Sequence, residues 1–308
     1  MSGRQLERLA IIGAGLIGSS IARAAREKGL AGQVVVADAD AEVRARVRAL
    51  GFADEVPDTV AHAARGADMV IACVPVGASG AVAREIAPEL KAGAIVSDVG
   101  SVKGAVVEAM APHIPAHAYL VPAHPVAGTE FSGPDAGFAS LFENRWCIVT
   151  PTDTAPADAV ARVCDLWRGM GANVETMTPK HHDLVLAITS HVPHLIAYNI
   201  VGTAAHLEET LTSEVIKFSA GGFRDFTRIA ASDPTMWRDV FLNNREAVLE
   251  MLGRFNEDLS QLQRAIRYGD GEALFDHFTR TRAIRRSIIE IGQETAAPDF
   301  GRRAPETK

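Results

Sequence analysis

The sequence predicts an α/β Rossmann-type domain followed by an all-helical domain. Short β-branched runs alternate with alanine-rich segments of helical spacing up to about residue 178, which is typical of a mostly parallel sheet covered on both faces. A glycine-rich turn at Gly13–Gly18 joins the first strand to the first helix. From Pro179 onward only helical patterns occur, so we expect no strand in the second half.

The first half supplies seven expected strands and five expected helices. The strands are Leu9–Gly13, Val34–Asp38, Met69–Val74, Ala94–Asp98, Ala118–Pro122, Cys147–Thr150 and Asn173–Met177. The helices are Ser19–Lys28, Ala41–Leu50, Ala78–Leu90, Lys103–Met110 and Ala157–Met170. We therefore divide the chain into a Rossmann-type domain at 1–178, a helical domain at 179–295 and a disordered tail at 296–308.

Composition narrows the class of protein. The 308 residues suit two ordinary domains, and 47% hydrophobic with 22% charged residues is a globular composition. We find no run of about 18 apolar residues, so we expect no membrane span and a cytoplasmic protein. A net charge of −7 without a basic run argues against nucleic acid as a partner. The three cysteines are few and far apart, which predicts neither a disulfide framework nor a metal site.

The glycine-rich turn predicts a dinucleotide site. Its pattern G-x-G-x-x-G follows a strand and opens a helix, where backbone N–H groups can bind a pyrophosphate. The expected cofactor contacts in this turn are Gly13, Gly15, Leu16, Ile17 and Gly18. Asp38 ends the second strand, where its carboxylate can bind ribose hydroxyls and repel a 2′-phosphate, so NAD is favoured over NADP. The alternative is a glycine turn of another α/β protein, with Asp38 as a helix N-cap.

Two further strand ends are expected to line the same crevice. Val74 and Pro75 end one strand, and Ser101 follows another. We count all three as cofactor contacts. Ser101 has a second interpretation, because serine often caps a helix and one is expected to begin near Lys103.

His124 is the candidate general base. It follows the strand that ends at Pro122 and precedes the segment Val126-Ala127-Gly128-Thr129-Glu130. Imidazole has the unperturbed pKa closest to neutrality, so it suits removal of a proton from an alcohol during hydride loss. Ser101 at the preceding strand end can orient it. The alternative is a histidine that only ends a strand.

The helical half contains three further groups of polar residues. His191 and His194 share one helix face, for which we favour substrate contacts or core packing over a zinc site. His181 and His182 are adjacent and should point apart, and we assign them no role. The segment from Gly221 to Arg228 holds two arginines that can bind a carboxylate with bidentate geometry, or that form a solvated surface turn.

Together these motifs resemble the prephenate/arogenate (cyclohexadienyl) dehydrogenase family of tyrosine biosynthesis. The matching segments are Gly13–Gly18, Asp98–Lys103, His124–Glu130, Thr189–His194 and Gly221–Arg228 through Trp237, within a resemblance that covers about residues 8–290. The resemblance implies a helical dimerisation and substrate domain, a homodimer and the cofactor NAD. It also implies oxidative decarboxylation of prephenate or arogenate to 4-hydroxyphenylpyruvate or tyrosine, with CO2 and NADH.

The resemblance also implies roles for single residues. His124 is the base and Ser101 orients it and touches substrate, while Arg228 binds the ring carboxylate. The residues implied to surround the substrate side chain are His191, His194 and Trp237. The acids implied to form an ionic gate with Arg228 are Glu130 and Asp225.

Two other functions are weighed against this one. A β-hydroxyacid or pyrroline-carboxylate type of dehydrogenase would use a lysine just after the domain boundary, where Lys180 is available, but it leaves the segment around His124 unexplained. A non-catalytic NAD-binding sensor would bind nucleotide and turn over no substrate. The sequence leaves open the choice between prephenate and arogenate, because Glu130 could bind an ammonium group or be engaged by Arg228.

Overall fold

The computed structural model describes residues 6–129, 131–206 and 221–290, with side chains through residue 287. The chain forms two compact units, residues 1–251 and 252–308. These two units are defined by how compactly the chain is packed. The boundary expected at residue 178 is defined by the change from mixed to helical secondary structure, and it stays a prediction.

A five-stranded parallel sheet forms the centre of the first unit. Its strands are β1 (Leu6–Ile12), β2 (Ala31–Ala37), β3 (Met69–Ala72), β4 (Ile95–Asp98) and β5 (Tyr119–Leu120), in the order β2-β1-β3-β4-β5. Ile12 pairs with both Ala37 and Ala72, and Ala72 pairs with Asp98. The carboxyl ends of four strands therefore lie at one edge, where ligands of open α/β sheets bind.

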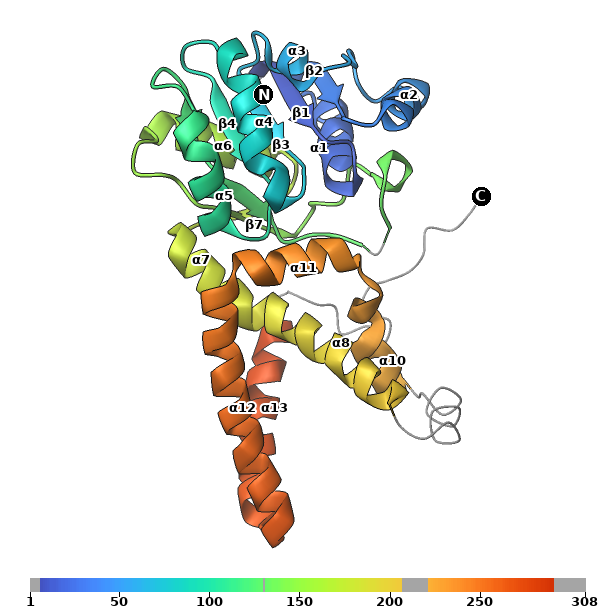
Figure 1. The fold of residues 1–308 in the computed structure, drawn as a ribbon, viewed down its shortest axis with the longest axis vertical. Coiled ribbons are helices and arrows are strands. Elements are labelled where there is room, and N and C mark those ends of the chain that lie inside the picture. The colour runs from blue at the N-terminus through green and yellow to red at the C-terminus, as the bar shows by residue number, and fades with distance from the viewer. Residues whose placement is uncertain (1–5, 130, 207–220, 291–308) are drawn as a thin grey trace. The chain divides into compact units, whose positions relative to one another are not determined.

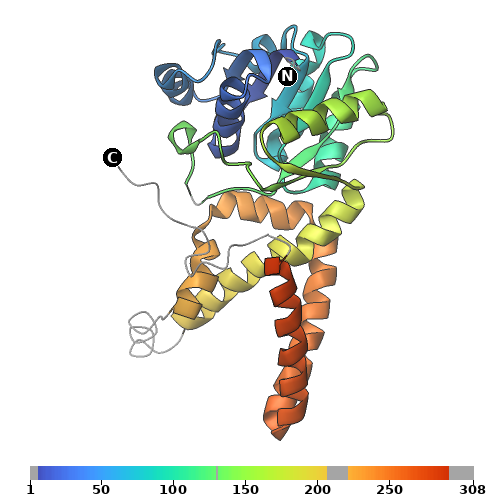
Figure 2. The ribbon, with the colours of Figure 1, turned by 180° about the vertical axis from the view of Figure 1, so that it is seen from behind.

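Helices cover both faces of this sheet. Leu9 and Ile11 of β1 belong to one apolar cluster and Ala10 and Ile12 to another, so successive residues of one strand pack on opposite faces. The first cluster includes α1 (Leu16–Glu27) and α6 (Ala157–Gly169), and the second includes α3 (Val60–Ala64), α4 (Ser79–Ile86) and α5 (Lys103–Met110). Figure 1 is seen from the side of α4 and α5, and Figure 2 from the side of α6. The expected Rossmann-type fold is confirmed.

A second, three-stranded sheet carries the candidate base. It consists of β6 (Ala123–Pro125), β7 (Trp146–Val149) and β8 (Asn173–Thr176); β6 is antiparallel to β7, and β7 is parallel to β8. The sequence pattern did not separate this sheet from the first, because only two residues lie between β5 and β6. His124 lies inside β6, opposite Ile148.

The described part of the second half is helical. It consists of α7 (Pro179–Leu186), a π-helical turn (Ala187–His191), α8 (Val192–Ala205), α10 (Gly221–Thr227), a 3-10 turn (Arg228–Ala231), α11 (Pro234–Asn243), α12 (Arg245–Tyr268) and α13 (Gly271–Glu290). The stretch Pro179–Ala205 is long and apolar enough to cross a membrane by length and composition, whereas no membrane span is expected from the sequence. Its buried residues include Leu186, Ala187 and Val192.

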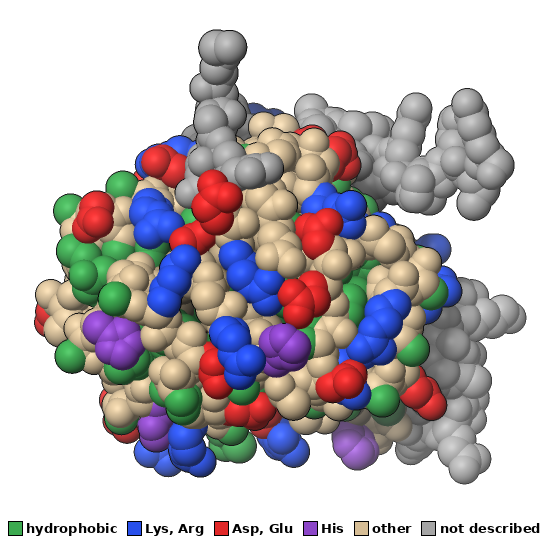
Figure 3. Space-filling model, turned by 90° about the horizontal axis from the view of Figure 1, so that it is seen from above, with side chains coloured by type: hydrophobic (Ala, Val, Ile, Leu, Met, Phe, Trp, Pro, Cys, Tyr) green, Lys and Arg blue, Asp and Glu red, His purple; other side chains and the backbone are tan. Residues whose placement is uncertain are grey.

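The second compact unit, residues 252–308, contains the rest of α12 and α13. The tail expected at 296–308 lies outside the described residues. Large apolar side chains of this unit are exposed on both helices: Leu259, Ile266, Tyr268, Phe275, Phe278 and Ile284. On the face drawn in Figure 3, acidic and basic side chains are interspersed and form no continuous basic patch.

Candidate active site

The glycine-rich turn has the shape that a bound pyrophosphate requires. Gly13 has a φ of +100°, and a Cβ there would lie 2.3 Å from the carbonyl oxygen of Cys73. A Cβ on Gly18 would lie 1.9 Å from the carbonyl oxygen of Gly13, so both positions need glycine for the fold itself. A Cβ on Gly15 would meet nothing within 4 Å. The second glycine thus leaves open space beside the N-terminus of α1, where the cofactor phosphates fit.

Asp38 supports the glycine-rich turn through its carboxylate, and its expected contact with the ribose stays a prediction. Its Oδ2 accepts a hydrogen bond from the backbone N–H of Ala14 at 2.8 Å, and its Oδ1 accepts one from Asp40 at 3.0 Å. The N-cap of α2 (Ala41–Leu50) is Asp40, so the alternative in which Asp38 caps that helix is wrong. Leu16 and Ile17 are half-buried and pack against the core.

The other strand ends are exposed to different degrees. Val74 is half-buried and Pro75 is exposed, both just after β3, and Ser101 is half-buried after β4. The N-cap of α5 is Val102, so Ser101 does not cap this helix. No hydrogen bond joins Ser101 to His124 in the described structure, and the role of Ser101 toward His124 stays a prediction.

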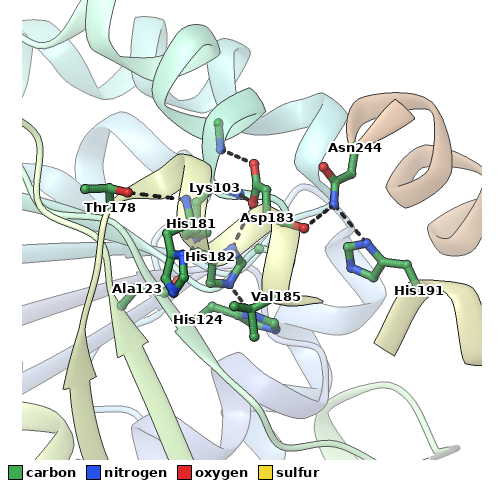
Figure 4. A network of polar contacts seen from close by, with 12 residues as sticks. Lys103, Ala123, His124, Thr178, His181, His182, Asp183, Val185, His191 and Asn244 are labelled. Carbon is green, nitrogen blue, oxygen red and sulfur yellow. Dashed lines mark hydrogen bonds and ion pairs between the residues drawn. The ribbon is translucent and has the colours of Figure 1, made fainter. Parts of the chain in front are cut away.

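His124 is buried in β6 and is bonded to a residue that the sequence analysis had set aside. Its side-chain Nδ1 lies 2.9 Å from Nε2 of His182, and the two rings meet edge to face with centroids 5.1 Å apart (Figure 4). His181 and His182 do point apart, since His181 is exposed and His182 is fully buried. The sequence assigns His182 no role, whereas the structure places it in direct contact with the candidate base. The available signal was its place four residues before Leu186, on the buried face of α7.

His182 is bonded in turn to Asp183. Nδ1 of His182 lies 2.8 Å from Oδ1 of Asp183. The same carboxylate accepts the backbone N–H groups of Lys103 at 2.7 Å and Gly104 at 2.8 Å, so it caps α5 from another helix. Burial is the largest effect that lowers the pKa of both His124 and His182, and it holds that of His124 well below 6.5. Both rings are therefore neutral at pH 7.

A buried ion pair holds the backbone next to His124. The Lys103 ammonium contacts the Asp98 carboxylate, and both side chains are almost completely buried. Lys103 Nζ also donates to the carbonyl oxygen of Ala123 at 2.7 Å, and Asp98 Oδ1 accepts the N–H of Ala123 at 3.3 Å. The end of β4 and the start of β6 are thereby fixed to each other.

His191 and Trp237 bring two unused donors to the helical side of the site. Asn244 Nδ2 donates to the carbonyl oxygen of Asp183 at 2.9 Å and lies 3.0 Å from Nδ1 of His191. His191 is fully buried, which lowers its pKa to about 4. Nε2 of His191 and Nε1 of Trp237 are both buried and have no hydrogen-bond partner in the described structure. The centroids of the His191 and Trp237 rings lie 6.1 Å apart.

His194 contacts the Trp237 ring and is affected by the charge of Arg228. It stacks on Trp237 with centroids 3.7 Å apart, and its Nδ1 bonds the carbonyl oxygen of Ser190 at 2.8 Å. Burial lowers the pKa of His194 most, and the nearby charge of Arg228 lowers it further. Arg228 and Asp225 are exposed, and the gate expected between them stays a prediction. Glu130, its other expected member, lies outside the described residues.

The two histidines expected on one helix face are not arranged around a metal. Among the described residues, no group of three His, Cys, Asp or Glu side chains could hold a metal ion. Nδ1 of His191 and Nδ1 of His194 are already bonded within the protein.

Comparisons with known proteins agree with this arrangement. Residues 21–176 match the family model described as prephenate dehydrogenase, nucleotide-binding domain, and residues 178–280 match the one described as prephenate dehydrogenase, dimerization domain. The chain is 44% identical to cyclohexadienyl dehydrogenase of Zymomonas mobilis over 92% of its own length and 96% of that protein. It is 32% identical to prephenate dehydrogenase of Bacillus subtilis, over 96% and 79% of the two chains.

A solved structure is similar over nearly the whole chain. It is prephenate dehydrogenase from Aquifex aeolicus in complex with hydroxyphenyl propionate and NAD+, with a TM-score of 0.85 and 32% identity. The similarity covers 92% of this chain and 98% of that one.

Proposed function

The chain belongs to the prephenate dehydrogenase family, and we propose that it oxidises prephenate, arogenate or both at the site around His124. It is an NAD-dependent dehydrogenase that catalyses oxidative decarboxylation. NAD, which the glycine-rich turn Gly13–Gly18 and Asp38 would hold, would supply the acceptor for the hydride that leaves the ring carbon carrying the hydroxyl group. Loss of the ring carboxylate as CO2 leaves its bonding electrons in the ring, the hydroxyl proton returns to the ring oxygen, and the ring becomes aromatic, so the reaction is irreversible.

We assign the proton transfer to His124. Its Nε2 takes the proton of the ring hydroxyl while the hydride leaves the same carbon. Arg228 binds the ring carboxylate through charge-assisted hydrogen bonds and holds it until CO2 departs. His191, His194 and Trp237 contact the side chain of the substrate, and Ser101 contacts both substrate and cofactor.

One observation carries this assignment. Lys103 and Asp98 bond both backbone polar groups of Ala123, the residue before His124. Asp98 ends β4, at the sheet edge where the glycine-rich turn also lies. The contacts of Ala123 with Lys103 and Asp98 therefore support a place for His124 beside the proposed nucleotide site. The β-hydroxyacid alternative requires Lys180 in the site, but Lys180 is exposed in the first turn of α7.

The helical half is proposed to form a homodimer. The dimerization model matches residues 178–280, which include exposed apolar side chains such as Ile200 and Val201 on α8 and Leu249 on α12. A second copy that covers this surface accounts for the apolar character of Pro179–Ala205 in a cytoplasmic enzyme. Sedimentation equilibrium of the purified chain checks the mass of the dimer.

The test is a substrate panel with a matched variant. NADH formation is measured with prephenate, arogenate and a small 3-hydroxyacid, each with NAD and NADP. We expect turnover of at least one cyclohexadiene with NAD and none of the hydroxyacid. His124→Asn should still bind NAD but lose about 10² to 10⁴ in kcat, the usual size of a general-base contribution. A fully active His124→Asn enzyme would remove His124 from the mechanism, and nucleotide binding without any turnover would favour the sensor.

A further inference from the structure

The carboxylate of Asp183 is fixed as an acceptor by the backbone. The N–H groups of Lys103 and Gly104 open α5, and one bonds each oxygen of Asp183 at 2.7 and 2.8 Å. Backbone N–H groups can only donate. A negative charge is also favourable at this end of a helix. Asp183 therefore presents a carboxylate to its other neighbour, His182.

This carboxylate determines which nitrogen of His182 carries the proton. Nδ1 of His182 is 2.8 Å from Oδ1 of Asp183 and must donate, because two acceptors at that distance would repel each other. Burial lowers the pKa of the His182 ring, which is therefore neutral at pH 7. A neutral imidazole has one N–H, so Nε2 of His182 carries a lone pair. That lone pair faces His124.

The same reasoning extends to His124. Its Nδ1 is 2.9 Å from the Nε2 lone pair of His182 and must be the N–H donor (Figure 4). Since the pKa of His124 also lies well below 6.5, its ring is neutral, and Nε2 is the nitrogen left with a lone pair.

We propose that His182 and Asp183 are positioning residues that hold His124 as the neutral tautomer with its proton on Nδ1 and its basic lone pair on Nε2. The proposal rests on the proposed function, in which Nε2 takes the hydroxyl proton. We call His124, His182 and Asp183 the positioning triad. His182 is fully buried and bonded on both nitrogens within the protein, so it acts on the reaction only through His124.

The triad also stabilises the charge that forms during the reaction. When Nε2 of His124 gains the proton, the ring becomes a cation, and the bonds through His182 connect it to the carboxylate of Asp183. Besides burial, the groups that lower the pKa of His124 are His182, Lys103 and His191, which are cationic or become so on protonation. The thiol of Cys147 lies against the backbone of His124, and Asp98 and Asp183 raise the pKa of the neighbouring His182. Loss of the carboxylate at 183 should therefore make His124 a weaker base.

Asp183 also joins the two halves of the site. Its backbone carbonyl oxygen accepts from Asn244, which in turn bonds His191. The residue thus contacts α5 through its side chain and the junction of α11 and α12 through its backbone. A single residue of α7 aligns groups that are far apart in the sequence.

The first experiment compares His182→Leu with His182→Gln. Leucine removes both hydrogen bonds, and we expect kcat per NAD-binding site to fall about 10²-fold, the lower range for a general-base contribution. KM for substrate and Kd for NAD should stay within threefold, because His182 touches neither. Glutamine places an amide oxygen near the position of Nε2, so kcat of His182→Gln should be about tenfold higher than kcat of His182→Leu. His181→Leu, one residue away and exposed, is the matched control and should keep normal kinetics.

A second experiment reads the tautomer directly. In protein labelled with ¹⁵N-histidine, the His124 signals, assigned by their absence in His124→Asn, should show a protonated Nδ1 and an unprotonated Nε2. In His182→Leu the same signals should shift toward the other tautomer. A third measurement is the pH profile of kcat/KM in Asp183→Asn. If His124 becomes a weaker base, its pKa falls, so the acid limb of the profile should move to lower pH. The plateau value of kcat/KM should also fall.

The possible results are distinguishable. Normal kcat in His182→Leu, or a protonated Nε2 in the wild-type resting enzyme, overturns the positioning triad while His124→Asn still tests the proposed function. The variants at 182 and 183 could instead bind NAD at fewer sites while kcat per site and the acid limb of the pH profile stay unchanged. That result would show that His182 and Asp183 only maintain the fold.

Discussion

The two sides of the site differ in how completely the protein satisfies its own polar groups. On the side of β6, His124, Lys103 and Asp98 are buried and bonded to one another or to backbone. On the other side, Arg228 and Asp225 are exposed near the end of α10. The difference indicates that the protein fixes the proposed proton-transfer side before substrate arrives, whereas the proposed carboxylate-binding side stays in contact with solvent.

His191 and Trp237 lie between these two sides and have one unused donor each. Leaving a buried N–H without a partner costs free energy, and native structures rarely keep one without a reason. Asn244 occupies Nδ1 of His191, so the free nitrogen is the one that carries hydrogen. Under the proposed function, polar acceptor atoms of the substrate complete these bonds.

The largest expected effect tests whether the stability of the buried side, around His124, depends on the ion pair of Lys103 and Asp98. Lys103→Met leaves the Asp98 charge buried without a partner and should lower the free energy of unfolding by about 3 to 5 kcal/mol. Denaturant unfolding at a fixed protein concentration measures this. Adding Asp98→Asn should recover part of the loss, because no unpaired charge then remains buried. The exposed pair of Arg46 and Asp135 is the control, and Arg46→Ala should leave the unfolding midpoint unchanged. A loss under 1 kcal/mol for Lys103→Met would contradict the contrast between the two sides.

The second prediction concerns pH. The folded protein holds the pKa of His191 at about 4, below its value of about 6.5 in the unfolded chain, so folding favours the neutral ring. The neutral His191 ring makes its full contribution to the free energy of unfolding above pH 6.5. This contribution is lost as pH falls toward 4, because the unfolded chain then binds a proton that the folded chain excludes. The loss should reach about 3 kcal/mol at pH 4 from His191, with His124 and His182 adding in the same direction.

Unfolding free energies between pH 7 and pH 4 measure this dependence in the wild type and in His191→Gln. The variant should show a flatter slope, since one of the excluded protons is removed. Equal slopes in the two proteins would mean that His191 is not held neutral by the fold.

The smallest of the three effects lies on the exposed side. Arg228→Ala removes a charge-assisted hydrogen bond to the ring carboxylate and should raise KM about tenfold or more. Arg224→Ala, an exposed arginine four residues earlier in α10, is the matched control and should leave KM within twofold. If Arg224→Ala raises KM and Arg228→Ala does not, the carboxylate contact belongs to Arg224.

Several features could be read from neighbouring residues alone. The glycine-rich turn, Asp38 after the second strand and the apolar runs of the parallel strands are local patterns, because each follows from the geometry of a few consecutive residues. The absence of strands in the described residues after 178 also follows from a local period. The sequence placed His124 near a strand end, but it missed the short antiparallel strand that contains it.

Only the tertiary structure decided what surrounds His124. Its partner His182 is 58 residues away, and Asp183 caps a helix that begins 80 residues earlier. Spacing along the chain predicts which face of a helix a side chain occupies, but it does not say which distant backbone that face will meet. The sequence by itself therefore determined the fold class, the cofactor and the candidate base. The packing of α7 against α5 and β6 decided which nitrogen of that base is free, because hydrogen-bond partners are set by distance in space.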